Sequence, residues 1–490
     1  MCSIRGDHCN YNSSGVVLYV GGNYNQNQNY GLFYLNGNNG ASNSNGNIGC
    51  RIHFDYIGLL HSRKCYFSCG AGVAHLLVKI LSIKGWLSTP SGAQERSLDK
   101  NGELFDMKRV GNLYGQMISD ENIREAIEVV NKSHRWRGNH HPNKTVLWVE
   151  TTIDNRIEEL RKIIEDGFEP TEPTVKRRYD RNARKWRDIA EPKLYPDQYV
   201  HHIMIQALEP IMMRGMDPFC CGSIKGRGAH YGVKYIKKWM KNDRKGTRWC
   251  AELDIYHFYP SLNPTMVMNR FRSLIKDYRV LDLVERVMRY GVMIGGYFSQ
   301  WFANTFLQPL DVLIRESGVN HYVRYMDNFT IFASNKKTLV RTLKSIKGWL
   351  VNHGLRLKDN WQYFKTRKRL PDALGYRYGH TYTLIRKARL LAIKRQVRSY
   401  HRQGGTVSAK FAMSMLSRLS GFRHCNASEI YRRVVPKGLQ KKLKAIIREH
   451  QRKERMEWST YLKLYAAGKL TSKASKRSER NTPYCAADAL

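Results

Sequence analysis

His321-Tyr-Val-Arg-Tyr-Met-Asp-Asn-Phe-Thr-Ile-Phe332 is the stretch that decides the fold. Two apolar runs flank Tyr325-Met-Asp-Asn328, a pattern that predicts two buried strands joined by a tight turn with an acidic residue at its tip. Well before it in the chain, Ala251-Glu-Leu-Asp-Ile-Tyr256 ends an apolar strand on a second aspartate, Asp254. Two carboxylates on neighbouring strands of one sheet can hold a pair of hard divalent cations, an arrangement suited to in-line phosphoryl transfer.

The chain as a whole is strongly basic. It has 490 residues and a formal net charge of +41, with 82 Lys and Arg residues against 41 Asp and Glu residues. This excess indicates a polyanionic partner, most simply nucleic acid, and we prefer that interpretation to a merely soluble basic surface. The length suggests roughly two to four structural units. An apolar content of 42% is sufficient for a sizeable core.

Cysteines and apolar runs indicate the cellular setting. The ten cysteines contain no Cys-x-x-Cys pair and no spacing typical of a disulfide framework, so reduced thiols are the default interpretation. No apolar stretch reaches about 18 residues, and the N-terminus lacks the pattern of a signal peptide. We therefore expect a cytoplasmic protein without a membrane partner. A zinc site, disfavoured because its spacing is unusual, would use His61, Cys65, Cys69 and His75.

The opening stretch belongs to a series of motifs that resembles a reverse transcriptase. Tyr325 to Asn328 matches the Tyr-x-Asp-Asp box of that family except at its last position. A single four-residue box is weak evidence, whereas five motifs in the right order carry much more weight. The four other segments that resemble motifs of the family are Asp254–Ser261, Ile294–Gln300 with Ala303-Asn304, Gly354–Asn360 and Leu374–Tyr378.

The resemblance implies an α+β fold shaped like a right hand, with fingers, a palm that contains an antiparallel sheet, and a helical thumb. An irregular Asn/Gly-rich segment at residues 1–106 precedes the hand. Apolar periodicity predicts amphipathic helices at 118–133, 156–165 and 196–214. The expected divisions are fingers at 107–240, palm at 241–378, basic helical thumb at 379–470 and a disordered tail at 471–490.

The resemblance also assigns the catalytic chemistry. Asp254 and Asp327 are the expected catalytic carboxylates, and with the backbone carbonyl of Ile255 they would bind two Mg²⁺ ions, or Mn²⁺. One ion lowers the pKa of the primer 3′-hydroxyl and the other stabilises the leaving pyrophosphate. Asn328, the fourth expected ligand, stands where the family usually has a second aspartate, and its amide oxygen carries no charge. This departure leaves a catalytically weak RNA-binding protein as an alternative.

Tyr259, Ile294 and Gly295 in the palm motifs are expected at the incoming nucleotide. In the family, the aromatic at the position of Tyr259 lies under the sugar and excludes a 2′-hydroxyl, with Phe258 as an inward packing partner. Gly295 would let the backbone approach the nascent base pair. Ile294 stands where many related polymerases have glutamine, and an apolar wall discriminates less sharply than a hydrogen-bonding side chain. Error-prone copying is therefore our hypothesis for Ile294, with plain core packing as the alternative.

Basic and polar side chains near the motifs are expected to contact nucleotide or nucleic acid. Lys185 and Arg187 would bind the triphosphate through charge-assisted hydrogen bonds. Ser299 and Gln300 would contact the template or the nucleotide. For the basic residues predicted at the nucleic-acid strands, a solvated basic surface is the alternative. The residues expected at the nucleic-acid strands are Arg177, Arg178, Arg184, Lys225, Arg227 and Asn304.

The Ile-Gly-x-x-x-Ser-Gln form at 294–300 resembles the enzymes of diversity-generating retroelements. Such enzymes miscopy adenine, and Asn codons are adenine-rich, so we interpret the Asn-rich residues 16–53 as a template repeat read in frame. On this interpretation Met107 is the natural start, and a disordered N-terminal arm is the alternative. The resemblance implies template RNA, an RNA–cDNA duplex and dNTPs as partners, with a separately encoded basic accessory protein. The target gene, primer, error rate and oligomeric state do not follow from the sequence.

Other polymerases with the same palm motifs stay open as alternatives. A group II intron maturase normally adds a maturation domain and often a Cys/His endonuclease, and paired Cys motifs are absent from this sequence. A retron enzyme is normally shorter and carries its own recognition motif. An antiphage-defence reverse transcriptase shares the palm motifs and is the third enzyme alternative.

Overall fold

The computed structural model divides into two compact units, Met1–Ala93 and Gln94–Leu490. It describes residues 108–137, 140–180, 185–319 and 321–470, together with the backbone of short strands between residues 2 and 107. The interpretations of residues 16–53 as a template repeat, of the N-terminal Cys/His group as a zinc site and of 471–490 as a tail lie outside the described residues. In the first unit a four-stranded sheet has the order β1-β2-β4-β3, formed by β1 (Cys2–Ile4), β2 (Asp7–Tyr11), β3 (Tyr19–Val20) and β4 (Leu35–Gly37).

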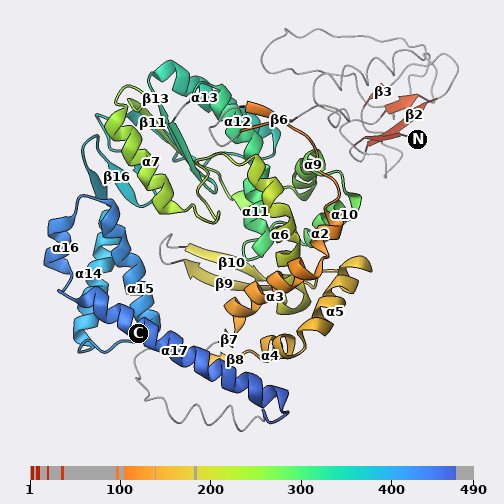
Figure 1. Cartoon of the computed structure of the whole chain (residues 1–490). Coiled ribbons are helices and arrows are strands. Elements are labelled where there is room, and N and C mark those ends of the chain that lie inside the picture. The colour runs from red at the N-terminus through yellow and green to blue at the C-terminus, as the bar shows by residue number, and fades with distance from the viewer. Residues whose placement is uncertain are drawn as a thin grey trace. The chain divides into compact units, whose positions relative to one another are not determined.

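The second unit begins with a hairpin and a largely helical part (Figure 1). The strands of this part are β5 (Glu95–Leu98), β6 (Leu104–Met107), β7 (Trp136–Arg137), β8 (His141–Pro142), β9 (Thr174–Asp180) and β10 (Lys185–Glu191). Its helices are α2 (Tyr114–Met117), α3 (Asp120–His134), α4 (Lys144–Thr151), α5 (Ile153–Glu165), η2 (Leu194–Gln198), α6 (Tyr199–Arg214) and α7 (Ala229–Asn242).

The three helices expected from the sequence are confirmed as α3, α5 and α6, of which α3 and α5 are amphipathic whereas α6 is buried on most sides. Helix α3 begins where the Ser119 side chain accepts a hydrogen bond from the Asn122 backbone N–H, and two acidic residues follow in the first turn. Its apolar stripe, which includes Ile123 and Ile127, is fully buried and packs against α6. Helix α6 is apolar on most sides because it lies inside this packing.

A four-stranded antiparallel sheet forms the centre of the second unit, with the order β12-β13-β11-β14. Its strands are β11 (Trp249–Asp254), β12 (His321–Tyr325), β13 (Asn328–Ala333) and β14 (Gln362–Lys365). The predicted pair of strands around residues 325–328 is therefore confirmed. The helices between and beside these strands are α8 (Phe258–Ser261), α9 (Pro264–Leu274), α10 (Tyr278–Val287), α11 (Tyr297–Phe306), α12 (Gln308–Glu316) and α13 (Lys336–Asn352).

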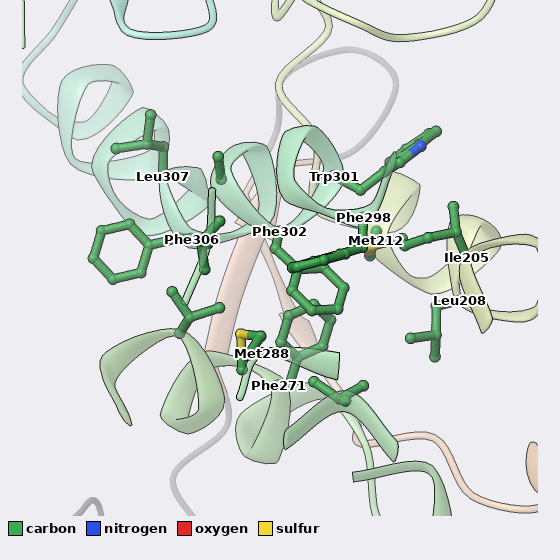
Figure 2. Close-up of a cluster of buried hydrophobic side chains, with 14 of the residues drawn as sticks. Ile205, Leu208, Met212, Phe271, Met288, Phe298, Trp301, Phe302, Phe306 and Leu307 are labelled. Carbon is green, nitrogen blue, oxygen red and sulfur yellow. The ribbon is translucent and has the colours of Figure 1, made fainter. Parts of the chain in front are cut away.

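An aromatic cluster joins the helices behind the sheet to the preceding helical part. Figure 2 shows Phe271, Phe298 and Phe302 gathered between α9, α11 and α6. The rings of Phe271 and Phe302 lie 4.5 Å apart between centroids, and those of Phe298 and Phe302 lie 5.1 Å apart. Such pairs contribute about 0.5–1.5 kcal/mol beyond the burial of their area. The cluster thereby fixes α11, which carries residues 297–300 of the motif at 294–300, against the rest of the core.

The C-terminal part is a small sheet followed by basic helices. The sheet has the order β15-β16-β17, and a second core packs its strands against α14 and α15. The class predicted from the sequence, α+β with an antiparallel central sheet, is confirmed. Within the described part of the chain, no helix combines the length and apolar character needed to cross a membrane. The remaining elements are β15 (Asp372–Ala373), β16 (Tyr376–Tyr378), β17 (Thr383–Ile385), α14 (Lys387–Arg402), α15 (Ala409–Ser420), η3 (Gly421–His424), α16 (Ser428–Val434) and α17 (Leu439–Ala466).

Candidate active site

The central sheet brings the two predicted carboxylates together. Strand β11 ends on Asp254, which pairs with Asn328 at the start of β13. Strands β12 and β13 pair at Tyr325 and Asn328, so Met326 and Asp327 form a two-residue turn between them. The backbone N–H of Ile255 donates a hydrogen bond to the carbonyl oxygen of Asp327 at 3.1 Å. Local strand pairing therefore places residues 73 positions apart (327 − 254 = 73) at the same end of one sheet.

The electrostatics of this pair are those of two carboxylates that share a site. Burial raises the pKa of Asp327, and the negative charge of Asp254 raises it further. The Lys358 ammonium acts in the opposite direction on Asp327, and it forms an ion pair with Oδ2 of Asp254. The other oxygen of Asp254, Oδ1, is buried without a hydrogen-bond partner among the described residues. A buried acceptor without a partner is costly, so this atom points to a ligand that the protein itself does not supply.

The donors at this site fit a divalent cation. Hard cations take carboxylate and carbonyl oxygens, and a positive charge would relieve both the unpartnered Oδ1 of Asp254 and its repulsion with Asp327. Asn328 donates a hydrogen bond from Nδ2 to Oδ1 of Asp327 at 3.1 Å. Asn328 is therefore a neutral hydrogen-bond partner of the Asp327 carboxylate in the structure, and a role for its oxygen as a metal ligand stays a prediction. The same holds for the backbone carbonyl of Ile255.

A buried polar network lies beneath the Met326–Asp327 turn and is hydrogen-bonded to it. Arg324 is completely buried, and its guanidinium donates to both carboxylate oxygens of Asp311 on α12, at 2.8 and 2.6 Å. Burial disfavours its charge, but the Asp311 carboxylate raises the pKa of Arg324 and keeps it protonated. The same guanidinium donates to the Met326 carbonyl at 3.3 Å and to Oδ1 of Asn304 at 2.8 Å. The network thus connects the Met326–Asp327 turn to helices α11 and α12.

Asn304 and Ser299 were expected to contact nucleic acid or nucleotide, and the structure places both in the core. Each is 1% exposed. The Asn304 amide accepts from Arg324 and donates from Nδ2 to the Gly222 carbonyl at 2.9 Å. These residues lie on the inward face of α11, because the helix packs with that side against the core. Asn304 acts on the active-site turn through Arg324 and Gly222.

Close packing against the turn requires glycine at position 222. A Cβ atom there would lie 2.7 Å from the backbone nitrogen of Met326, and equally close to Cγ and Sδ of its side chain. Met326 itself has a φ of 56°, in the left-handed region that the two-residue turn requires. Sequence reasoning did not single out Gly222 or Arg324. The signal available for Arg324 was a charged residue within an apolar strand pattern.

Tyr259 lies near the carboxylates, on the short helix α8. It is half-buried, and its hydroxyl pKa is raised by burial and then by the charge of Asp327. Phe258 beside it is buried, as predicted for an inward packing partner. The structure thus brings Tyr259 to the end of the sheet that carries Asp254 and Asp327. Its contact with a sugar stays a prediction.

The loop before α11 lies against strand β10. Gly295 has a φ of 121°, and a Cβ atom there would lie 2.0 Å from the carbonyl oxygen of Ala190. The Ala190 N–H donates to the Ile294 carbonyl at 2.8 Å. Contact with β10 is thus a structural requirement for Gly295, in addition to its predicted approach to a base pair. Ile294 is half-buried and Gln300 is exposed, and their contacts with a nucleotide stay predictions.

The basic residues predicted in the fingers lie mainly on the β9–β10 hairpin. Their side chains are exposed or half-exposed and are partly neutralised by acidic neighbours. Arg187 pairs with Asp180 at 2.9 Å, Arg178 with Glu191, and Arg177 lies 4.0 Å from Asp188. Lys185 and Lys225 are exposed, and Arg184 lies outside the described residues.

Arg227 has a structural role in the loop before α7. Its guanidinium donates to the carbonyl oxygens of Asp217 at 2.8 Å and Cys220 at 3.3 Å. These bonds hold the segment that contains Gly222, which packs against the catalytic turn. Contact of Arg227 with nucleic acid stays a prediction.

Comparison with known proteins identifies this part of the chain. Residues 178–377, which include both aspartates, match the family model described as "Reverse transcriptase (RNA-dependent DNA polymerase)". Protein YkfC of Escherichia coli (strain K12) is 24% identical over 317 residues, 59% of this chain and 75% of that protein. Nuclear intron maturase 1, mitochondrial, of Arabidopsis thaliana is 24% identical over 101 residues, 21% of this chain and 14% of the maturase. The chain therefore contains a reverse transcriptase domain with an α+β polymerase fold and is an RNA-directed DNA polymerase, a nucleotidyltransferase.

Proposed function

We propose that the protein copies an RNA template into cDNA at Asp254 and Asp327, with two divalent metal ions, and that it does so with frequent errors. The observation that carries the catalytic part is the convergence of the two carboxylates, with Oδ1 of Asp254 buried and unpartnered. Reverse transcriptases generally use divalent cations, typically Mg²⁺. Such ions bound here would favour the 3′-alkoxide of the primer and neutralise the leaving pyrophosphate.

The chain's own residues have distinct tasks in this proposal. Asp254, Asp327 and the carbonyl of Ile255 hold the cations, while Arg324 fixes the turn that carries Asp327. Lys358 pairs with Asp254 and is close enough to the site to contact the triphosphate once a cation takes that carboxylate oxygen. Tyr259 excludes a 2′-hydroxyl. Lys185 and Arg187 bind phosphates through charge-assisted hydrogen bonds.

The proposal includes the error-prone subtype, a diversity-generating retroelement enzyme that copies a template-repeat RNA. Two features support it: Ile294 in place of a hydrogen-bonding residue, and the Asn-rich composition of residues 16–53. An apolar side chain beside the nascent pair leaves a mismatch without a hydrogen-bond penalty, so discrimination falls. In this subtype a separate basic accessory protein joins the enzyme, with RNA bridging the two like-charged partners.

A group II intron-type enzyme is the second candidate. The similarity to the Arabidopsis protein named as a nuclear intron maturase favours it, although that similarity covers 21% of this chain. The two candidates predict different products. An intron-type enzyme copies its template accurately, whereas the proposed subtype introduces errors opposite adenine.

Primer extension tests the proposal in two steps. Purified full-length protein is given poly(rA)/oligo(dT) with Mg²⁺ or Mn²⁺, next to Asp254→Asn and Asp327→Asn variants. We expect extension by the wild type and a loss of at least about 10³-fold in each variant, because each removes a charged cation ligand. Wild-type protein that binds the duplex without extending it would leave only the RNA-binding alternative.

Sequencing of the cDNA then tests the subtype. On a template that contains all four bases, errors should concentrate opposite adenine, and Ile294→Gln should lower them. Accurate cDNA from an active wild type, or an unchanged adenine error rate in Ile294→Gln, would contradict the error-prone proposal. A near-copy of codons 16–53 in the neighbouring DNA is the expected genetic signature of a template repeat.

A further inference from the structure

We propose that His140, His450 and Glu454 bind a divalent transition-metal ion such as Zn²⁺, which fastens helix α17 to the turn before β8. His140 comes from that turn, and the other two residues come from α17. One possible ligand atom from each of the three lies within 4.8 Å of the others. The site is separate from the catalytic carboxylates and has no part in the proposed polymerase reaction.

The distances between these atoms suit a small tetrahedral ion. His140 Nδ1 lies 3.7 Å from Oε1 of Glu454, and His450 Nε2 lies 3.4 Å from the same oxygen. Ligand atoms bound tetrahedrally to Zn²⁺ at about 2.0–2.1 Å are roughly 3.3 Å apart. The two His–Glu distances are close to that value, and the two imidazole nitrogens, which lie within 4.8 Å of each other, must approach further to complete the geometry. Two imidazoles and one carboxylate are a ligand set that Zn²⁺ takes, with one position left for water.

The ring of His140 is already oriented for this task. Its Nε2 lies 3.0 Å from Oε2 of Glu457, so a proton on Nε2 is shared with that carboxylate and Nδ1 keeps its lone pair. A carboxylate behind a histidine ligand fixes the ring and raises its basicity toward the metal. The ring also stacks on Trp136, with centroids 4.0 Å apart and an interplanar angle of 12°. His140 holds this place with a φ of 61°, in the left-handed region.

The neighbouring contacts show what the ion would fasten. His450, Glu454 and Trp458 follow one another at intervals of four residues, so they share one face of α17. Trp458 is 3% exposed and packs against Val146 and Leu147 of α4. The metal site therefore extends an existing contact between α17 and α4, elements far apart in the sequence that lie side by side in Figure 1.

Trp458 also forms a polar contact in the same interface. Its Nε1 donates to Oε2 of Glu150 at 2.7 Å. Arg135 lies over the Trp458 ring and pairs with the other oxygen of Glu150 at 3.3 Å. These contacts hold α17 in place independently of any ion. An ion at the histidines would add a second point of attachment, two helical turns away on the same helix face.

Matched variants of the full-length protein test the proposal by equilibrium dialysis against Zn²⁺ and metal analysis. His450→Ala and His140→Ala remove a ligand, and His401→Ala removes an exposed histidine of α14 outside the cluster. We expect wild type and His401→Ala to bind about one Zn²⁺ ion per chain more than the two ligand variants. Other cysteines and histidines that take Zn²⁺ are present in all of them, so the difference reports on this cluster.

Two further measurements separate a metal site from ordinary ion pairs. Zn²⁺ should raise the unfolding temperature of the wild type and of His401→Ala more than that of His450→Ala. Glu457→Gln should weaken Zn²⁺ binding by roughly 10- to 100-fold without abolishing it. If the His450→Ala variant keeps the circular dichroism of the wild type and binds as much Zn²⁺ per chain, the proposal is overturned. The cluster would then be only ion pairs between protonated histidines and glutamates.

Discussion

Substitution of Gly222 by alanine should displace the catalytic turn. The new Cβ would lie 2.7 Å from the Met326 backbone nitrogen, whereas non-bonded atoms in protein interiors settle at about 3.5 Å or more. The backbone of the turn or of the Gly222 loop must therefore move by roughly 0.8 Å, from 3.5 − 2.7. A misplacement of about 1 Å at reacting groups costs about 10²-fold in rate, so kcat should fall by that order. Overpacking should lower the free energy of unfolding by about 1–3 kcal/mol.

Single-turnover primer extension measures the rate and denaturant unfolding measures the stability. Gly348→Ala is the matched control, because a Cβ atom there meets nothing within 4 Å and the residue lies inside helix α13. The control should keep its activity and gain about 0.5–1 kcal/mol of stability. The double variant Gly222→Ala/Met326→Ala removes the clash with the flexible side chain but keeps the clash with the backbone nitrogen. Full recovery in the double variant, or a single variant that retains wild-type kcat, would refute the reasoning.

Three other perturbations probe the charges around the site. Asp327→Asn should abolish synthesis yet stabilise the metal-free protein. Burial and the charge of Asp254 raise the pKa of Asp327 in the folded protein, so ionising this carboxyl lowers the free energy of unfolding as the pH rises through that raised pKa. Unfolding temperatures in EDTA should therefore favour the variant increasingly as the pH rises from the usual carboxyl pKa of about 4 through the raised pKa of Asp327, and a constant difference would contradict this sign. Arg324→Met should lower the free energy of unfolding, measured by denaturant, by roughly 3–5 kcal/mol, because it leaves the Asp311 carboxylate charged and buried without its partner. The double variant Arg324→Met/Asp311→Asn should recover part of this loss. Strictly additive losses would argue against the pairing. Lys358→Gln should lower the Mg²⁺ concentration needed for half-maximal extension by roughly two- to five-fold, because the Lys358 ammonium competes with cations for Asp254. A higher Mg²⁺ requirement in the variant would argue against this competition.

The catalytic end of the sheet could be predicted from the sequence because its signals are local. Two apolar runs define β12 and β13, and the two residues between them leave room only for a tight turn. Asp254 was found in the same way, as the last residue of an apolar strand. The order of the motifs then supplied the relation between the two strands.

The support beneath the turn could not be predicted, because it depends on tertiary contacts. Arg324 is buried together with the two residues before it on β12, and its partner Asp311 lies on a helix whose orientation no local pattern defines. Asn304 was placed at the template because its motif resembles a substrate-binding segment, whereas its helix turns that amide into the core. The fit of Gly222 against Met326 likewise requires two segments whose approach the sequence alone does not give.

Binding of Mn²⁺ to the metal-free protein tests the central claim most directly, since free Mn²⁺ gives a paramagnetic resonance signal that disappears on binding. The wild type should remove Mn²⁺ from solution, while Asp254→Asn and Asp327→Asn should each bind it at least about 10-fold more weakly. Asp359→Asn, which changes an exposed carboxylate beside Lys358, should bind it as the wild type does. Equal Mn²⁺ affinity in all four proteins would contradict the account, because these two carboxylates would then not form the cation site.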